Sequence, residues 1–85
     1  MTYQEIFIQI ISEVSGKPKQ ELSELLNNIR KIHPGGKWDI EIPDSESKEL
    51  LTKLRGEAPG ILRWLAEGAL EVSREAAKHG SKSTH

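Results

Sequence analysis

The sequence contains no cysteine, so disulfide bonds, thiolate-bound zinc, iron–sulfur clusters and a cysteine nucleophile are all excluded. It also has no long hydrophobic run. The most apolar stretch, 6–11, is interrupted by Gln9 and is too short for a signal-peptide core or a membrane span. An excess of charge of one sign is missing too, because twelve Lys and Arg residues stand against thirteen Asp and Glu residues. This balance argues against nucleic acid or an anionic membrane as a partner. We therefore expect a soluble cytoplasmic protein.

The chain is long enough for one hydrophobic core. Two domains within 85 residues would each fall below the size that folds without disulfides or metals. Hydrophobic residues make up only 35% of the sequence, so the core must be compact and mostly aliphatic. The sequence therefore predicts one helical domain over residues 1–80 and a disordered polar tail over residues 81–85.

Two N-terminal segments carry apolar residues at intervals of three and four, the spacing of an amphipathic helix. The first begins with a capping box formed by Thr2 and Glu5, and Gly16 ends it. The second has Pro18 in its first turn and ends at His33, where a Pro-Gly-Gly sequence favours a tight turn. Both segments are predicted to be helices.

Two further helices are predicted in the second half of the chain. Asp44 is a good N-cap for the third helix, which ends before Gly56. The fourth helix is predicted from Pro59 to His79. The complete pattern predicts an all-α fold, a compact four-helix domain in which short connections favour antiparallel neighbours.

The segment 36–43, between the second and third helices, has a different period. Trp38, Ile40 and Ile42 alternate with two acidic residues, the pattern of an extended strand with one apolar side. No second strand-like segment exists to pair with it, so it is either an arm lying across the helices or a strand that pairs with another chain. We expect it to pack within the chain over the second and fourth helices, with Trp38 as the anchor.

No constellation of residues indicates catalysis, a metal or a cofactor. The three histidines, His33, His79 and His85, do not have the helical spacing of metal ligands. The serines do not lie in a strand–turn–helix elbow, and helix caps and exposed faces explain them. The chain is therefore expected not to be an enzyme and to need no cofactor.

Asp44 and Ser45 open a helix after a long loop, an arrangement that looks like an acyl or peptidyl carrier protein. That resemblance implies a phosphopantetheine group on Ser45. In carrier proteins the residue after the serine is usually apolar, whereas here it is Glu46. Helix capping explains Asp44 without any modification, so the carrier is kept as an alternative.

Residues 48–68 resemble a segment of the phage and plasmid primase-helicases of superfamily 3. In those proteins a helix ends before a Glu-x-Pro-Gly-Ile-Leu-x-Trp-Leu-x-Glu-Gly stretch, which here is EAPGILRWLAEG (57–68). The resemblance implies a helix–turn–helix packing unit with Ile61 and Trp64 as buried anchors. It includes no ATP-binding motif and implies no helicase activity, so a helical accessory fragment related to replication proteins is a further alternative.

Protein interaction is the function that the sequence favours, and homodimerisation is its preferred form. Three features indicate it: the apolar edge of segment 36–43, Ile8 lying off the main stripe of the first helix, and small residues on the fourth helix. The candidate interaction surface consists of Ile8, Trp38, Ile40, Ile42, Ala66, Ala69 and Ser73. The alternative for all of these residues is that they complete the core of a monomer.

Overall fold

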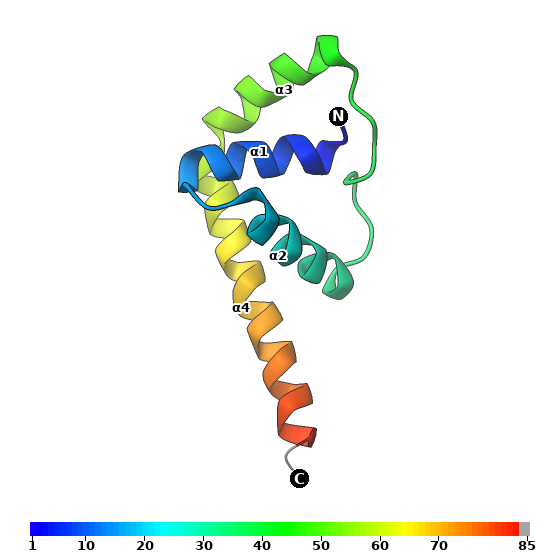
Figure 1. Cartoon of the computed structure of the whole chain (residues 1–85), viewed down its shortest axis with the longest axis vertical. Helices are drawn as coiled ribbons and strands as arrows, with labels where there is room; N and C mark the ends of the chain where they lie inside the picture. The colour runs from blue at the N-terminus through cyan, green and yellow to red at the C-terminus, as the bar shows by residue number, and fades with distance from the viewer. Residues whose placement is uncertain (84–85) are drawn as a thin grey trace.

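The computed structural model describes residues 1–83, with side chains as far as Lys78. It consists of four helices (Figure 1): α1 (Tyr3–Ser15), α2 (Lys19–Ile32), α3 (Asp44–Gly56) and α4 (Ala58–Ser83). The β-structure of the described residues is a single isolated bridge between Thr2 and Glu41. The predicted all-α four-helix fold is therefore confirmed.

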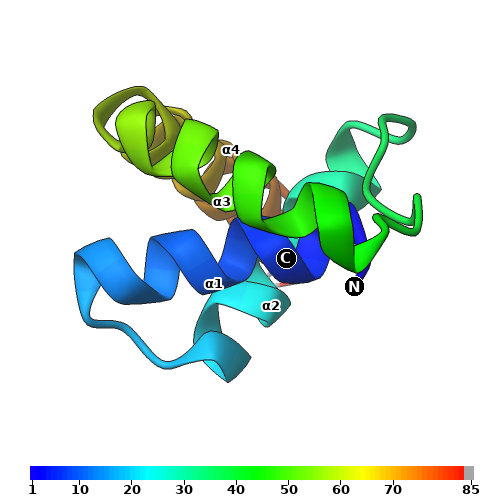
Figure 2. The same cartoon turned by 90° about the horizontal axis from the view of Figure 1, so that it is seen from above.

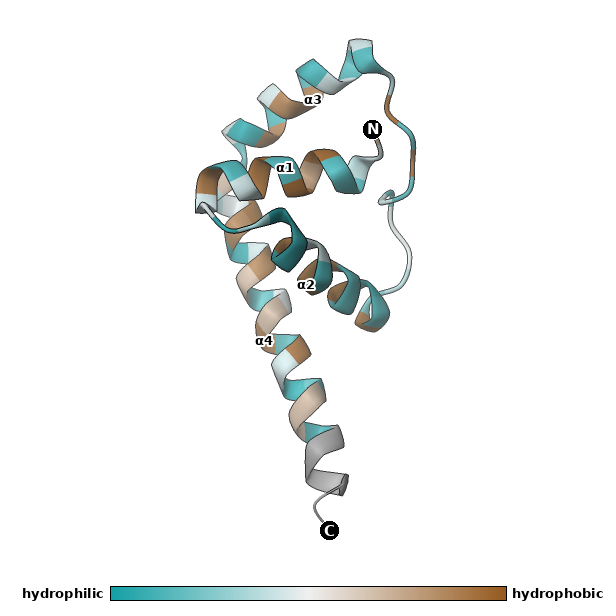
Figure 3. Ribbon diagram, viewed as in Figure 1, coloured by the Kyte–Doolittle hydropathy of each residue, from teal (hydrophilic) through white to brown (hydrophobic). Residues whose placement is uncertain are grey.

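Helix α1 is the centre of the fold and contacts each of the other three helices. Two perpendicular views place it between α3 and α2 (Figures 1 and 2). Figure 3 shows hydrophobic residues along much of α1, and a helix that is apolar on most sides must be covered from several directions. Its buried residues are Ile6, Phe7, Ile8, Ile10 and Ile11.

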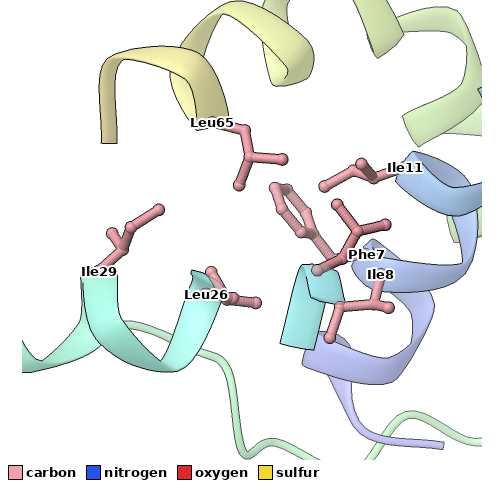
Figure 4. Close-up of a cluster of buried hydrophobic side chains, with 7 residues drawn as sticks. Phe7, Ile8, Ile11, Leu26, Ile29 and Leu65 are labelled. Carbon is pink, nitrogen blue, oxygen red and sulfur yellow. The ribbon is translucent and has the colours of Figure 1, made fainter. Parts of the chain in front are cut away.

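The buried side chains form two clusters that share α1. The larger cluster joins α1, α2 and α4 (Figure 4) and contains Phe7, Ile8, Ile11, Leu22, Leu26, Ile29 and Leu65. The smaller cluster joins Ile6 and Ile10 to Leu54 of α3. Ile61 of α4 is half-buried and packs against both clusters, so it connects the two halves of the core.

Helix α1 begins and ends where the sequence predicts. Thr2 Oγ1 accepts a hydrogen bond from the Glu5 backbone N–H at 3.2 Å, and the Glu5 carboxylate accepts one from the Thr2 N–H at 3.2 Å. The hydrogen bonds that this carboxylate accepts from the Thr2 N–H and from the Thr2 hydroxyl (3.1 Å) lower the pKa of Glu5 below its ordinary value. At the other end Gly16 adopts a left-handed conformation with φ of 75°. The capping box and the glycine stop are both confirmed.

Helix α4 packs closely on α2 at Gly68. A Cβ atom at this position would lie 2.5 Å from Ile29 Cδ1 and 3.0 Å from Ile29 Cγ1. Ile29 is only 3% exposed, so it has little space into which to move. The absence of a side chain at Gly68 thus permits the close approach of the two helices.

Helix α4 is much longer than the others. Its 26 residues correspond to about 39 Å at the usual helical rise. It projects past the other helices (Figure 1), which gives the molecule its elongated dimensions of 54 × 23 × 19 Å. Within residues 1–83, no helix combines the length and the apolar character that crossing a membrane requires.

Two predicted helix starts are wrong by one residue. Pro18 is the N-cap of α2 and does not occupy its first turn. Likewise, Pro43 is the N-cap of α3, and Asp44 is the first helical residue with no side-chain capping bond. The Ser47 hydroxyl donates instead to the Pro43 carbonyl oxygen at 3.0 Å, so Ser47 bonds back along the helix.

The predicted ends of the last helix are also shifted. Helix α4 begins at Ala58, one residue before Pro59, and continues to Ser83 beyond the predicted end at His79. A helix that starts before Pro59 places the proline in the first turn, where its missing N–H is tolerated. Of the predicted tail, residues 84–85 lie outside the described part of the chain.

Candidate interaction site: an aromatic groove

The site depends on the segment 36–43, called the arm here, which runs past the N-terminal end of α1 (Figure 1). The first N–H groups of a helix have no acceptor within that helix. Here the Tyr3 N–H donates to the Ile40 carbonyl at 2.9 Å, and the Gln4 N–H donates to the Trp38 carbonyl at 3.0 Å. The Ile42 N–H donates in turn to the Met1 carbonyl at 2.7 Å. The arm therefore caps α1, and its pairing partner is the start of this chain.

Side chains from two helices hold the arm beside Trp38. Arg30 of α2 forms an ion pair with Asp39 at 2.7 Å, and its guanidinium also donates to the Gln4 side chain at 2.6 Å. The indole of Trp38 lies against Gly36, where a Cβ atom would be 3.0 Å from Trp38 Nε1. Gly36 also has φ of 99°, which other residues rarely adopt. The position of Trp38 is thus set by α1, α2 and this glycine.

All four aromatic residues of the sequence meet at this place. Phe7 is central: its ring centroid lies 5.0 Å from that of Trp38 and 5.7 Å from that of Trp64, both in edge-to-face geometry. Trp38 and Trp64 are 5.8 Å apart, and Tyr3 packs edge-on against Trp38 at 5.7 Å. These separations are typical of favourable aromatic pairs. The cluster links α1, the arm and the first turns of α4.

An open groove of about 710 Å³ lies along this cluster, and we call it the aromatic groove. Its lining consists of Phe7, Trp38, Gly56, Glu57, Pro59, Gly60, Ile61 and Trp64. This volume is within the range of ligand pockets. Trp64 is 40% exposed on its wall, so a large apolar surface remains open to water.

The predicted geometry of the arm is wrong in one respect. The Ile40 N–H donates to the Lys37 carbonyl at 3.2 Å, which closes a turn and breaks the alternation of an extended strand. As a result Ile40 is 52% exposed, whereas Trp38 and Ile42 are half-buried. The arm packs within the chain, as predicted: backbone hydrogen bonds join it to α1, and the Arg30–Asp39 ion pair joins it to α2. Its aromatic contact with α4 runs from Trp38 to Trp64.

The other predicted surface residues do not form one surface. Ile8 is only 7% exposed and belongs to the larger core cluster, so it completes the core and offers no second contact surface. Ile42 packs on the smaller cluster. On α4, Ala66 and Ser73 are exposed, while Ala69 is half-buried beside α2 residues. The structure therefore divides the predicted surface between the core, the arm and α4.

The prediction that Trp64 is a buried anchor is wrong. It is 40% exposed, because the helix turns that side chain toward the arm and the groove and leaves Leu65 to fill the core. Sequence reasoning also missed Phe7 as a groove residue, since its helical spacing indicates only burial. No local signal in the sequence joins Phe7, Trp38 and Trp64, which come from three separate segments.

The lining of the groove is suited to binding an apolar group and has few side chains that could take part in catalysis. Glu57 is the only ionisable side chain in its lining, so the described residues supply no acid–base pair there. Among the described residues, no three His, Asp or Glu side chains lie close enough together to hold a metal ion. Ser45 lies in the first turn of α3 and is exposed.

Comparison of the chain with protein-family models, with curated proteins and with solved structures finds no match.

Proposed function

We propose that this chain is a non-catalytic protein-interaction module of the cytoplasm whose aromatic groove receives an apolar side chain of a protein partner. The observation that carries the proposal is the exposure of Trp64. Tryptophan is among the residues that contribute most to protein interfaces, especially beside other aromatic anchors. In this groove it stands next to Trp38 and Phe7.

The exposed surface of Trp64 is large enough to matter energetically. A tryptophan side chain buries roughly 150–250 Å² when fully covered. Its 40% exposure leaves about 80 Å² in water, and covering that area is worth about 2 kcal/mol. This favours a partner that covers the indole with apolar atoms.

The groove is also formed in advance of binding. Backbone hydrogen bonds fix the arm to α1, and the Arg30–Asp39 ion pair fixes it to α2. A wall that is already ordered loses little conformational entropy when a ligand enters. Binding free energy is therefore not used to assemble the site.

The test is selection of peptides from a displayed library on the immobilised protein, followed by calorimetry of the enriched peptides. Peptides with an apolar anchor residue should bind the wild type and lose at least about tenfold in affinity for Trp64→Ser. Leu70→Ser is the matched control, since Leu70 is an exposed apolar residue of the same helix, at 52%, and does not line the groove. Enriched peptides that bind Trp64→Ser as tightly as the wild type would contradict the proposal, and so would a selection that enriches none.

Two alternatives use other parts of the chain. A carrier role is supported by the exposure of Ser45 in the first turn of α3, where a transferase could reach it. An accessory role related to replication proteins is supported by the contact between α3 and α4 across the short junction at Glu57. Self-association is a further form of protein interaction, and the outer side of α4 offers a surface for it.

A further inference from the structure

An exposed leucine lies on the side of α4 that faces away from the core. Leu70 is 52% exposed, although Leu65 and Gly68 on the same helix are buried. Three small residues share its side of the helix at spacings of four, three and four, and all of them are exposed. We call this set the outer face: Ala66, Leu70, Ser73 and Ala77.

The spacing of the outer face is that of the seam between two helices of a coiled coil. Small side chains on both sides of Leu70 leave room for a second helix to come close. All four residues of the outer face are exposed, so the described part of this chain does not cover them. None of the groove-lining residues belongs to the outer face, so the two surfaces are separate.

Three exposed charged residues lie beside the outer face, Arg63, Glu67 and Arg74, and the last two indicate what covers it. Glu67 and Arg74 are both exposed, and neither belongs to an ion pair among the described residues. They are seven residues apart, so they lie on the same side of the helix with about 10.5 Å between them along its axis. The midpoint between them falls beside Leu70. When a second copy is turned by 180° and placed against the first, Glu67 of each copy therefore lies opposite Arg74 of the other.

We propose that a second copy of this chain pairs with the outer face of α4, with the two α4 helices antiparallel about a two-fold axis at Leu70. Each Leu70 contacts the Leu70 of the other copy, and each Glu67 faces the Arg74 of the other copy. Two-fold dimers are the commonest oligomers of soluble proteins. In a parallel arrangement the Glu67 and Arg74 residues of the two copies would lie on opposite sides of the seam, so they would form no ion pair between the copies. Both this proposal and the function proposed for the groove are protein interactions, but they use different surfaces and do not depend on each other.

Sedimentation equilibrium of the full chain, between about 1 µM and 1 mM, tests the proposal. The wild type should show a reversible monomer–dimer equilibrium. Leu70→Glu should weaken dimerisation by about tenfold or more, because the charge would be buried at the two-fold axis. Circular dichroism should show an unchanged helix content, since Leu70 is exposed in the monomer. A monomeric wild type across this range, or a Leu70→Glu variant that dimerises as well as the wild type, would overturn the proposal.

The antiparallel register is tested by exchange of the two charges. Glu67→Arg alone and Arg74→Glu alone each place like charges opposite one another, and each should weaken dimerisation by about tenfold. The double variant should regain the wild-type equilibrium. Glu24→Arg, at an exposed position of α2, is the matched control and should change nothing. A double variant no better than the single variants would show that Glu67 and Arg74 do not face each other.

Trp64→Ser separates this proposal from the function of the groove. It should weaken peptide binding by at least about tenfold and leave the dimer intact, because Trp64 is not part of the outer face. If Trp64→Ser dissociates the dimer, the copies meet through the groove and the pairing through α4 is wrong. If Leu70→Glu dissociates the dimer while no peptide binds the groove, the pairing through α4 is supported and the function proposed for the groove is wrong.

Discussion

Replacing Gly68 by alanine sets two effects of known size against each other. Alanine is favoured over glycine inside a helix by about 0.8–1 kcal/mol. Against this, the added methyl carbon would lie 2.5 Å from Ile29 Cδ1 and 3.0 Å from Cγ1, well inside van der Waals contact. Overfilling a packed interface costs about 1–3 kcal/mol, and Ile29 is 3% exposed and cannot turn away into solvent. We expect a net loss of about 1 kcal/mol, or about 4–8 °C in Tm.

The assay is urea unfolding followed by circular dichroism, with a matched glycine in the same helix as the control. A Cβ atom on Gly60 meets nothing within 4 Å, so Gly60→Ala should be neutral or stabilise by up to about 1 kcal/mol. Ile29→Val removes the Cδ1 atom that clashes, so Gly68→Ala should cost clearly less in the Ile29→Val background. The close packing of α2 and α4 would be refuted if Gly68→Ala stabilised the protein like Gly60→Ala, regardless of residue 29.

Three further predictions follow from the arm, the capping box and α3. Trp38→Ala should lower the free energy of unfolding by about 1–3 kcal/mol, because the half-buried indole packs on two helices, whereas Ile40→Ser should change it by less than about 0.5 kcal/mol. Equal effects in urea unfolding would mean that Trp38 does not anchor the arm. The hydrogen bonds from Thr2 lower the pKa of Glu5, so its carboxylate stabilises the fold above the ordinary value of 4.5, and this contribution is lost as the pH falls through the lowered pKa. The stability difference between the wild type and Glu5→Gln should therefore be present at neutral pH and disappear in acid, and a difference independent of pH would contradict the capping box. Finally, intact-mass measurement after expression with a broad phosphopantetheinyl transferase should show Ser45 unmodified, and an adduct there would establish the carrier alternative.

The helices could be predicted from the sequence because their signals are local. The Thr2–Glu5 capping box and Gly16 fix the ends of α1 through contacts within a few residues of the chain. The apolar spacing of α2 also predicted its buried side, which carries Leu22, Leu26 and Ile29. Helix starts beside proline were predicted less well, since Pro18 and Pro43 each provide a cap without a side-chain bond.

The aromatic groove could not be predicted because it depends on contacts between distant segments. Trp38 reaches Phe7 and Trp64 only because the arm caps α1, and the hydrogen bonds that do so involve backbone groups, which leave no trace in the residue types. The turn between Lys37 and Ile40 likewise forms through a backbone hydrogen bond and overrides the alternating pattern. Sequence reasoning also missed Leu70, although its position on the helix, on a different side from Leu65, is a local signal that could have identified it.

The most direct test of the proposed interaction site is a map of amide and indole chemical-shift changes on titration with a selected peptide. Binding at the groove predicts that the indole N–H signals of Trp38 and Trp64 shift together with the amides of Gly60 and Ile61, which lie in its lining. In Trp64→Ser the same peptide should leave the remaining signals unchanged. Shifts confined to the outer face of α4, with both indole signals unmoved, would contradict the assignment of the groove as the binding site.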